Sequence, residues 1–383
     1  MNAESTTAGA TDRCQRMAAV RRLVVKVGTT TVAGAGTQLA RPVIRRLVGD
    51  VVALRQRGLE VAIVTSGAVA AGMGRLGLEE RPREVADLQA VAAVGQNLLM
   101  NTYEGLFRRH AVPVGQVLLT AEDMLEDRRR YLNLSNTFRQ LFHFGAVPVI
   151  NENDSVGVAE LKRTIGENDM LAAYVANLIR AELLVIFSDV EGIYASVEQG
   201  PKGGIIREVR PGDGIESCIG AAGSRLGRGG MSTKVRAARL MTACGEMTVI
   251  AHGRRHRLLD VLAGLEVGTL FLPAGKRLRS RKRWIGFASP LRGSLEVDRG
   301  AEQAIVAQGR SLLPAGVVAC TGDFAAGDVV RVESRDHVEL ARGVCRYAAA
   351  EVARIQGRSS EEVARILGRR APEVIHRDDL VVL

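Results

Sequence analysis

Short apolar runs alternate along the chain with longer stretches in which apolar residues recur at helical spacing. The short runs are rich in β-branched residues and are predicted to be strands, at residues 23–27, 61–64, 112–119, 147–150, 183–187 and 247–251. Residues 41–57 place apolar side chains every three or four positions, which predicts a helix that Gly58 ends. Continuous apolar strands that alternate with helices are typical of parallel sheets. The pattern therefore predicts an α/β fold, with a mostly parallel sheet sandwiched by helices.

The pattern changes after a nearly continuous basic run at residues 276–283. Short strand-like pieces with glycine turns follow it, at residues 293–297, 316–322, 327–332 and 341–344. Two helices are expected among them, near residues 301–308 and 360–367. This texture favours a small, mainly β, barrel-like domain. We therefore expect a disordered tail at 1–19, an α/β domain at 20–279, a basic linker at 280–291 and a small β domain at 292–383.

Composition narrows the class of protein. A chain of 383 residues is long enough for two domains, and 46% hydrophobic with 25% charged residues is ordinary for a globular protein. No apolar run approaches the ~18 residues that cross a bilayer, so we expect no membrane association. Five scattered cysteines without a C-x-x-C pair favour reduced thiols in the cytoplasm over a disulfide or zinc framework. The net charge of +10 is compatible with anionic partners such as nucleotides or RNA.

The residues before Met17 are small and polar, without an apolar signal core. They are interpreted as the disordered tail, or as extra residues ahead of a start near Met17.

Polar residues collect where the predicted strands end. The tripeptide Glu-Asn-Asp occurs twice, at residues 152–154 after a strand and at 167–169 before a helix. Either copy alone would be an ordinary polar turn, but the repetition favours a binding pocket. The carboxyl ends of parallel strands meet at one edge of a sheet, where ligands bind. Other strands end in 28–30, 65–67 and 188–189, and Gly28 and Gly67 are expected to offer backbone N–H groups to an anion.

A glycine-rich loop at residues 223–234 opens a further predicted helix at 235–243. Its glycines let the backbone approach a phosphate, Ser232 or Thr233 can cap the helix, and Lys234 stands where a phosphate at the helix end would meet it. The Walker A spacing is absent, because the lysine follows the serine and threonine. A flexible surface loop fits the composition equally well. Residues 72–77 match G-x-G-x-x-G but do not join a strand to a helix, so we predict no dinucleotide site there.

Several of these segments, in order along the chain, resemble the glutamate 5-kinases of the amino-acid kinase family. They read LVVKVGT at 23–29, IVTSGAVAAG at 63–72, PVINEND at 148–154, GENDML at 166–171, SDVEGIY at 188–194 and GGMSTK at 229–234. The C-terminal part resembles the PUA domain that many of these enzymes carry, at residues 281–284, 311–314 and 374–380. The resemblance covers nearly everything after residue 20. It implies an amino-acid kinase domain at 20–279 and a PUA domain at 292–383.

The resemblance also implies a reaction. ATP, with Mg²⁺, would phosphorylate the side-chain carboxylate of L-glutamate to L-glutamyl 5-phosphate, the first step of proline biosynthesis. The implied catalytic residues are Lys26, Asp169 and Lys234, with Asp169 organising the two lysines. The implied glutamate contacts are Ser66, Asp154 and Asn168. The implied nucleotide contacts are Lys26, Ser188, Asp189, Arg228, Gly229, Gly230, Met231, Ser232, Thr233 and Lys234.

The sequence departs from the family's usual residues at three positions. Ser188 stands where the family usually has threonine, and Glu167 where it often has aspartate, so the hydroxyl and the charge are kept. Arg228 replaces a small residue in the nucleotide loop. The family further implies a dimer or tetramer and feedback inhibition by proline.

The residue types suit such a reaction. A glutamate side chain, with a pKa of about 4.3, is ionised at neutral pH, so this nucleophile needs no general base. The barrier arises from repulsion between two anions, which positioning and fixed positive charge reduce. Lys26 and Lys234 can flank the phosphoryl group, and Asp154 can pair with the substrate's ammonium group. His252 and His256 lack a third ligand nearby, so the metal ligands remain unknown.

Two other interpretations stay open. The chain could be another amino-acid kinase relative that acts on a different carboxylate or on carbamate. It could also bind RNA through the PUA-like domain and the basic run, in which case binding would weaken with salt.

Overall fold

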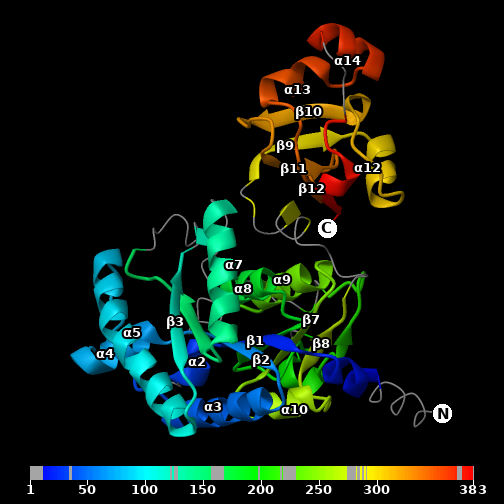
Figure 1. The fold of residues 1–383 in the computed structure, drawn as a ribbon. Helices are drawn as coiled ribbons and strands as arrows, with labels where there is room; N and C mark the ends of the chain where they lie inside the picture. The colour runs from blue at the N-terminus through cyan, green and yellow to red at the C-terminus, as the bar shows by residue number, and fades with distance from the viewer. Residues whose placement is uncertain are drawn as a thin grey trace, which may run out of the picture. The chain divides into compact units, whose positions relative to one another are not determined.

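The computed structural model describes residues 12–33, 37–120, 123–124, 128–156, 168–196, 199–215, 218, 230–273, 282, 285–286, 289, 291–368 and 373–382. The chain divides into two compact units, with the main division between Arg277 and Leu278. Each unit has its own sheet (Figure 1). The domain bounds and the basic linker proposed from the sequence remain predictions, because most of residues 274–290 lie outside the described ranges.

The first unit is built on an eight-stranded sheet with the order β3-β4-β2-β1-β5-β7-β8-β6. Its strands are β1 (Arg22–Val27), β2 (Glu60–Thr65), β3 (Val114–Leu119), β4 (Val147–Glu152), β5 (Leu183–Ser188), β6 (Glu208–Val209), β7 (Met247–His252) and β8 (Thr269–Phe271). Neighbouring strands pair in parallel, except that β8 runs antiparallel to β7. The predicted α/β fold with a mostly parallel sheet is confirmed, and every predicted strand of this unit is present.

Helices cover both faces of this sheet. They are α2 (Thr29–Val32), α3 (Arg41–Gln56), α4 (Ala68–Leu76), α5 (Val85–Phe107), α7 (Arg128–His143), α8 (Asn168–Ile179), α9 (Met231–Ala243) and α10 (Leu258–Leu262), with short 3₁₀ turns η1 (Arg108–His110) and η3 (Gly200–Gly203). α3 and α10 lie on one face, and α8 and α9 lie on the other (Figure 1). The predicted helix at 41–57 is confirmed, and Gly58 after it has a φ of +84°. That left-handed conformation favours glycine and ends the helix.

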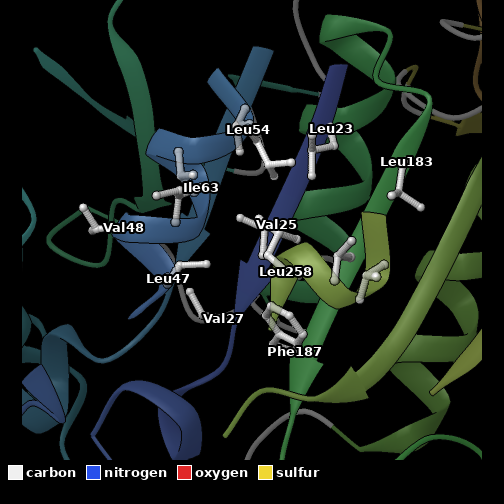
Figure 2. Packing of buried hydrophobic residues seen from close by; sticks show 14 of the residues in the cluster. Leu23, Val25, Val27, Leu47, Val48, Leu54, Ile63, Leu183, Phe187 and Leu258 are labelled. Atoms are coloured by element: carbon white, nitrogen blue, oxygen red, sulfur yellow. The ribbon is translucent and has the colours of Figure 1, made fainter. Parts of the chain in front are cut away.

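The central strand β1 divides its side chains between the two faces. Leu23, Val25 and Val27 are buried in a hydrophobic cluster with Leu47 and other side chains of α3 (Figure 2). Successive side chains of a strand point to opposite faces. Lys26 therefore points away from this cluster, toward the face that α8 and α9 cover. A lysine so placed is 6% exposed and needs a counter-charge.

Helices α4 and α5 pack against each other through glycines. A Cβ atom at Gly72 would lie 1.9 Å from the carbonyl oxygen of Val91, and one at Gly95 would lie 1.8 Å from that of Ala68. Neither distance is compatible with a side chain, so both glycines serve close backbone approach. The G-x-G-x-x-G match at residues 72–77 therefore lies in this helix pair and not in a strand-to-helix turn.

The second unit has a five-stranded sheet with the order β10-β9-β11-β12-β13. Its elements are β9 (Leu291–Val297), α12 (Arg299–Val306), η6 (Pro314–Gly316), β10 (Val317–Gly322), β11 (Val329–Glu333), β12 (Glu339–Val344), α13 (Ala349–Ile355), α14 (Ser360–Leu367), η7 (Arg377–Asp379) and β13 (Leu380–Val382). Leu295, Val332 and Tyr347 lie in its separate hydrophobic core. The predicted small, mainly β domain is confirmed, and α13 was not predicted.

The prediction of a disordered tail is wrong for residues 12–19. Residues 12–18 form a helix, and Met17 is 1% exposed. The guanidinium of Arg13 donates a hydrogen bond of 2.6 Å to the carbonyl oxygen of Val267. Burial of Met17 and this long-range bond hold the segment against the sheet domain, whereas residues 1–11 lie outside the described ranges. Within the described residues, no helix combines the length and apolar character of a membrane span.

Candidate active site

A buried carboxylate holds two lysines together on the α8–α9 face of the sheet. Asp169, the second residue of α8, is 0% exposed. Its Oδ1 lies 2.6 Å from the Nζ of Lys26, and its Oδ2 lies 3.2 Å from the Nζ of Lys234. Lys26 comes from β1 and Lys234 from the first turn of α9, so the fold joins three segments that are distant in the sequence.

The two lysines hold Asp169 in its ionised form. Burial favours the neutral form of Asp169, but the attraction of Lys26 and Lys234 outweighs it and lowers the pKa of the carboxyl group. Asp169 therefore stays ionised at neutral pH and is not a proton acceptor. Two ammonium groups share this carboxylate, and Lys26 is 6% and Lys234 is 5% exposed. Because little water reaches the two lysines, their attraction for an anion is stronger.

Two helices begin beside this cluster. α8 begins at Asn168 and α9 at Met231, and the first turn of a helix has free N–H groups and a partial positive charge. The prediction that Ser232 or Thr233 caps α9 is wrong, because the N-cap is Gly230 and it has no side-chain cap bond. The hydroxyl of Thr233 instead lies 2.9 Å from the carbonyl oxygen of Gly230, inside the first turn. The helix ends add to the positive field of the lysines.

A network of amide side chains lies next to Asp169. The Nδ2 of Asn168 is 2.7 Å from the Oγ of Ser66 and 2.9 Å from the carbonyl oxygen of Thr65. The same nitrogen is 3.0 Å from the Oδ1 of Asn151, whose own Nδ2 donates to the Oε1 of Gln96 at 2.8 Å. The structure thus brings together Ser66 and Asn168, two of the three residues expected to contact glutamate. Asp154 lies just beyond β4 and is partly exposed.

Asn151 was expected only as part of the polar segment 151–154 at the end of its strand, and Gln96 was not predicted. Asn151 directly precedes the first Glu-Asn-Asp copy, and no individual contact was predicted for it. Gln96 sits within the long helix α5, and nothing in its neighbourhood distinguishes it from a surface residue. Behind the network, Tyr103 of α5 is fully buried with its hydroxyl 3.1 Å from the Oγ1 of Thr65. Burial raises the pKa of Tyr103 to about 12, so it remains a neutral hydrogen-bonding group.

Some of the residues expected to contact the nucleotide lie in the described part of the chain, and others lie outside it. Ser188, 5% exposed at the end of β5, has its Oγ 3.0 Å from the Oδ1 of the exposed Asp189. Its carbonyl oxygen accepts a hydrogen bond of 2.9 Å from the N–H of Gly253, which follows β7. Gly230, Met231, Ser232, Thr233 and Lys234 open α9. Arg228, Gly229 and Glu167 lie outside the described residues.

The prediction that Gly28 offers its backbone N–H to an anion is wrong. Its N–H donates to the carbonyl oxygen of Phe187 at 3.3 Å, because this residue still continues the pairing of β1 with β5. It is therefore not free to bind an anion. Gly67 is the N-cap of α4, directly after Ser66, with a φ of +104°. The offer of its N–H to an anion remains a prediction.

Metal-binding side chains do not gather in the described part of the chain. Among those residues, no group of three or more His, Cys, Asp or Glu could hold a metal ion. The Nε2 of His256 lies 2.9 Å from the Oε2 of Glu191, and the Nδ1 of His252 accepts from the N–H of Arg254. Both histidines thus have protein partners, and the carboxylate of Asp169 is occupied by two lysines.

The family of the chain follows from two family models. The model of the amino acid kinase family matches residues 21–251, which is more than half of the chain. The chain belongs to the amino acid kinase family. The PUA domain model matches residues 293–367, within the second unit of this amino acid kinase. Lys26, Asp169 and Lys234, with the amide network beside them, all lie inside the kinase match.

Full-length relatives place this amino acid kinase among proteins named glutamate 5-kinase, which confirms the resemblance. One from Moorella thermoacetica is 44% identical over 369 residues, covering 95% of this chain and 96% of that protein. One from Herpetosiphon aurantiacus is 46% identical over 364 residues, covering 94% and 98%. Among solved structures, a Giardia carbamate kinase is similar over 67% of this chain and 99% of that one, with 14% identity and a TM-score of 0.47.

Proposed function

We propose that this amino acid kinase transfers the γ-phosphoryl group of ATP to the side-chain carboxylate of L-glutamate. The product is L-glutamyl 5-phosphate, which opens proline biosynthesis. Relatives that share 44% and 46% of their residues over nearly the whole chain are named glutamate 5-kinase. The structural observation that carries the proposal is the pair of lysines on Asp169 directly beside the amide network of Asn168 and Ser66. A cationic site for phosphate thus adjoins a polar site for an amino acid.

The catalytic step needs charge and position more than proton transfer. The attacking carboxylate of glutamate is already ionised, so its oxygen can bond to the γ-phosphorus as the bond to the ADP oxygen breaks. Lys26 and Lys234 neutralise the charge on the transferring oxygens, and the helix ends at Asn168 and Met231 add to this field. Asp169 keeps both ammonium groups in place before the substrates arrive. Such preorganisation avoids a rearrangement during the reaction.

The amino-acid pocket is proposed to recognise the substrate's ammonium group. The Oδ1 of Asn168 is buried and has no hydrogen-bond partner among the described residues. An unpaired buried acceptor is costly, and an N–H of the substrate's ammonium group would satisfy it. Asp154 is proposed to pair with the charge of the same group, and the hydroxyl of Ser66 to contact the substrate from the end of β2. The contacts with Asn168 and Asp154 require an ammonium group, which an amino acid has and carbamate lacks.

The nucleotide is proposed to lie against Ser188, Asp189 and the start of α9 at Gly230 to Lys234, with Arg228 and Gly229 from the same loop. Mg²⁺ commonly binds through substrate phosphates and water. It would therefore arrive with ATP.

The finer predictions from the sequence remain proposals. They are a cytoplasmic location, a dimer or tetramer, feedback inhibition by proline, and RNA binding by the second unit. The match to the PUA domain supports only the last of these.

The choice of substrate provides the direct test. Purified protein with ATP and Mg²⁺ is assayed for ADP release and for hydroxamate formation with L-glutamate, L-aspartate, N-acetylglutamate and carbamate. We expect turnover with glutamate and little with the others. The variant Lys234→Ala, prepared in the same way, controls for contaminating kinases. Turnover with carbamate or aspartate but not with glutamate would refute the proposed substrate and leave the kinase assignment intact.

A further inference from the structure

Helix α5 supplies a second layer of polar contacts behind the amide network. Gln96 and Tyr103 are seven residues apart, which places them two turns apart on the same face of the helix. The Oε1 of Gln96 accepts from Asn151 of β4, and the hydroxyl of Tyr103 contacts Thr65 of β2. These two strands also hold Ser66 and Asn151 in place. Helix α5 therefore supports the pocket, although none of its residues was predicted to line it.

The three amides form a chain whose direction is set at one end. The carbonyl oxygen of Thr65 can only accept a hydrogen bond, so the atom of Asn168 that lies 2.9 Å away must be its NH₂ group. That NH₂ group also faces the Oδ1 of Asn151 at 3.0 Å, which turns the NH₂ of Asn151 toward Gln96. Donation therefore runs from Asn168 through Asn151 to Gln96. The acceptor on Gln96 keeps this order at the other end, because it holds the NH₂ group of Asn151 away from Asn168.

This direction determines which atom the network leaves for a ligand. The Oδ1 of Asn168 is buried without a hydrogen-bond partner in the described part of the chain, and so is the Nε2 of Gln96 at the far end. If Gln96 no longer accepted from Asn151, the amide of Asn151 could turn over. Its NH₂ group would then face the NH₂ group of Asn168, and two donors would oppose each other. Asn168 would then be held by Thr65 and Ser66 alone.

We propose that Gln96 is a positioning residue for the amino-acid substrate. Its carbonyl oxygen keeps the NH₂ group of Asn151 turned away from Asn168, so that the Oδ1 of Asn151 helps Thr65 and Ser66 to hold the NH₂ group of Asn168. The Oδ1 of Asn168 then accepts from the substrate's ammonium group. The identity of that substrate rests on the proposed function. Gln96 itself touches neither the substrate nor the reacting atoms, so it affects binding of the amino acid and leaves the nucleotide side alone.

Two substitutions at Gln96 separate its acceptor from its volume. Gln96→Leu removes the acceptor and is expected to raise the KM for glutamate about tenfold, as the loss of one hydrogen bond in a buried network does, with the KM for ATP unchanged. Gln96→Glu keeps an oxygen that accepts from Asn151 and is expected to stay within about threefold of the unsubstituted protein, since the lost Nε2 has no partner to lose. Asn97→Leu, on the exposed side of the same helix, is the matched control and is expected to leave both KM values unchanged.

Asn151→Ala and the double variant Gln96→Leu/Asn151→Ala test the route of the effect. Because Gln96 acts only through Asn151, the double variant is expected to have the glutamate KM of Asn151→Ala alone. If Gln96→Leu does not fold, Gln96→Glu still decides, because a glutamate KM as high as that of Asn151→Ala would overturn the proposal. So would an equal rise in the KM for ATP, or effects that multiply in the double variant. Absence of any glutamate turnover in the unsubstituted protein would overturn the proposed function, and this inference with it.

Discussion

Replacing Asp169 with asparagine removes the charge that holds Lys26 and Lys234 while it preserves the shape of the side chain. The carboxylate is 0% exposed and contacts both ammonium groups, at 2.6 and 3.2 Å. In the variant an amide oxygen can still accept from one lysine, but its NH₂ group opposes the other. The two cations then lose the carboxylate between them and repel each other. The substitution therefore tests both the stability and the catalytic role of the cluster.

The size of the expected loss of stability and activity follows from the burial of Asp169. Removing one partner of a buried ion pair costs about 3–5 kcal/mol of folding free energy, and we expect Asp169→Asn to fall within this range. Losing one preorganised group that stabilises the transition state lowers kcat by about 10²–10³. Because both lysines depend on Asp169, kcat should fall at least about a hundredfold. The KM for glutamate should change much less, because the amide network of Asn168 is retained.

The dependence of stability on acidic pH provides a second measurement of the charge on Asp169. The lysines hold the pKa of Asp169 in the folded protein below its ordinary value of 3.8, so the unfolded chain binds this proton more readily. Ionised Asp169 therefore contributes stability at pH values above its ordinary pKa, and that contribution is lost as the pH falls through the lowered pKa of the folded state. The difference in unfolding free energy between the unsubstituted protein and Asp169→Asn should be largest near neutral pH. This difference should become smaller at pH values below the ordinary pKa of Asp169.

The assays are coupled ADP release and urea unfolding from pH 7 downward. Asp50→Asn is the matched control, because Asp50 is 1% exposed, is paired with Arg257 and accepts from the N–H of Leu258 at 3.0 Å. Asp50 lies on α3, which covers the opposite face of the sheet from Lys26. We expect it to lose stability without a comparable loss of kcat. Unchanged kcat in Asp169→Asn, or an equal loss in Asp50→Asn, would refute the reasoning.

The remaining predictions concern the pocket and the packing of α4 on α5. Asp154→Ala should raise the KM for glutamate about tenfold, because the ammonium group loses a charged partner, and an equal rise for ATP in steady-state assays would contradict it. Gly95→Ala should cost about 3 kcal/mol in urea unfolding, because its Cβ would lie 1.8 Å from the carbonyl oxygen of Ala68. Gly105→Ala on the same helix has nothing within 4 Å and should be neutral or slightly stabilising.

The hydrophobic pattern determined the secondary structure and the class of fold. Runs such as 183–187 became buried strands, and the spacing in 41–57 became α3, because burial of an apolar stripe is a local property of a segment. The polar ends of these strands indicated where the site lies, since parallel strands bring their carboxyl ends to one edge. The resemblance to glutamate 5-kinases then assigned roles to residues that the pattern alone left open.

Only the tertiary structure decided which partner each polar group has. The contact of Asp169 with both lysines, the occupied N–H of Gly28 and the link from Asn151 to Gln96 join residues from different elements. The helix at residues 12–18 forms where composition predicted a tail, because Met17 finds a hydrophobic core that its neighbours in sequence do not reveal. Local propensity depends on adjacent residues, whereas hydrogen bonds and buried charges depend on what the fold brings within a few ångströms.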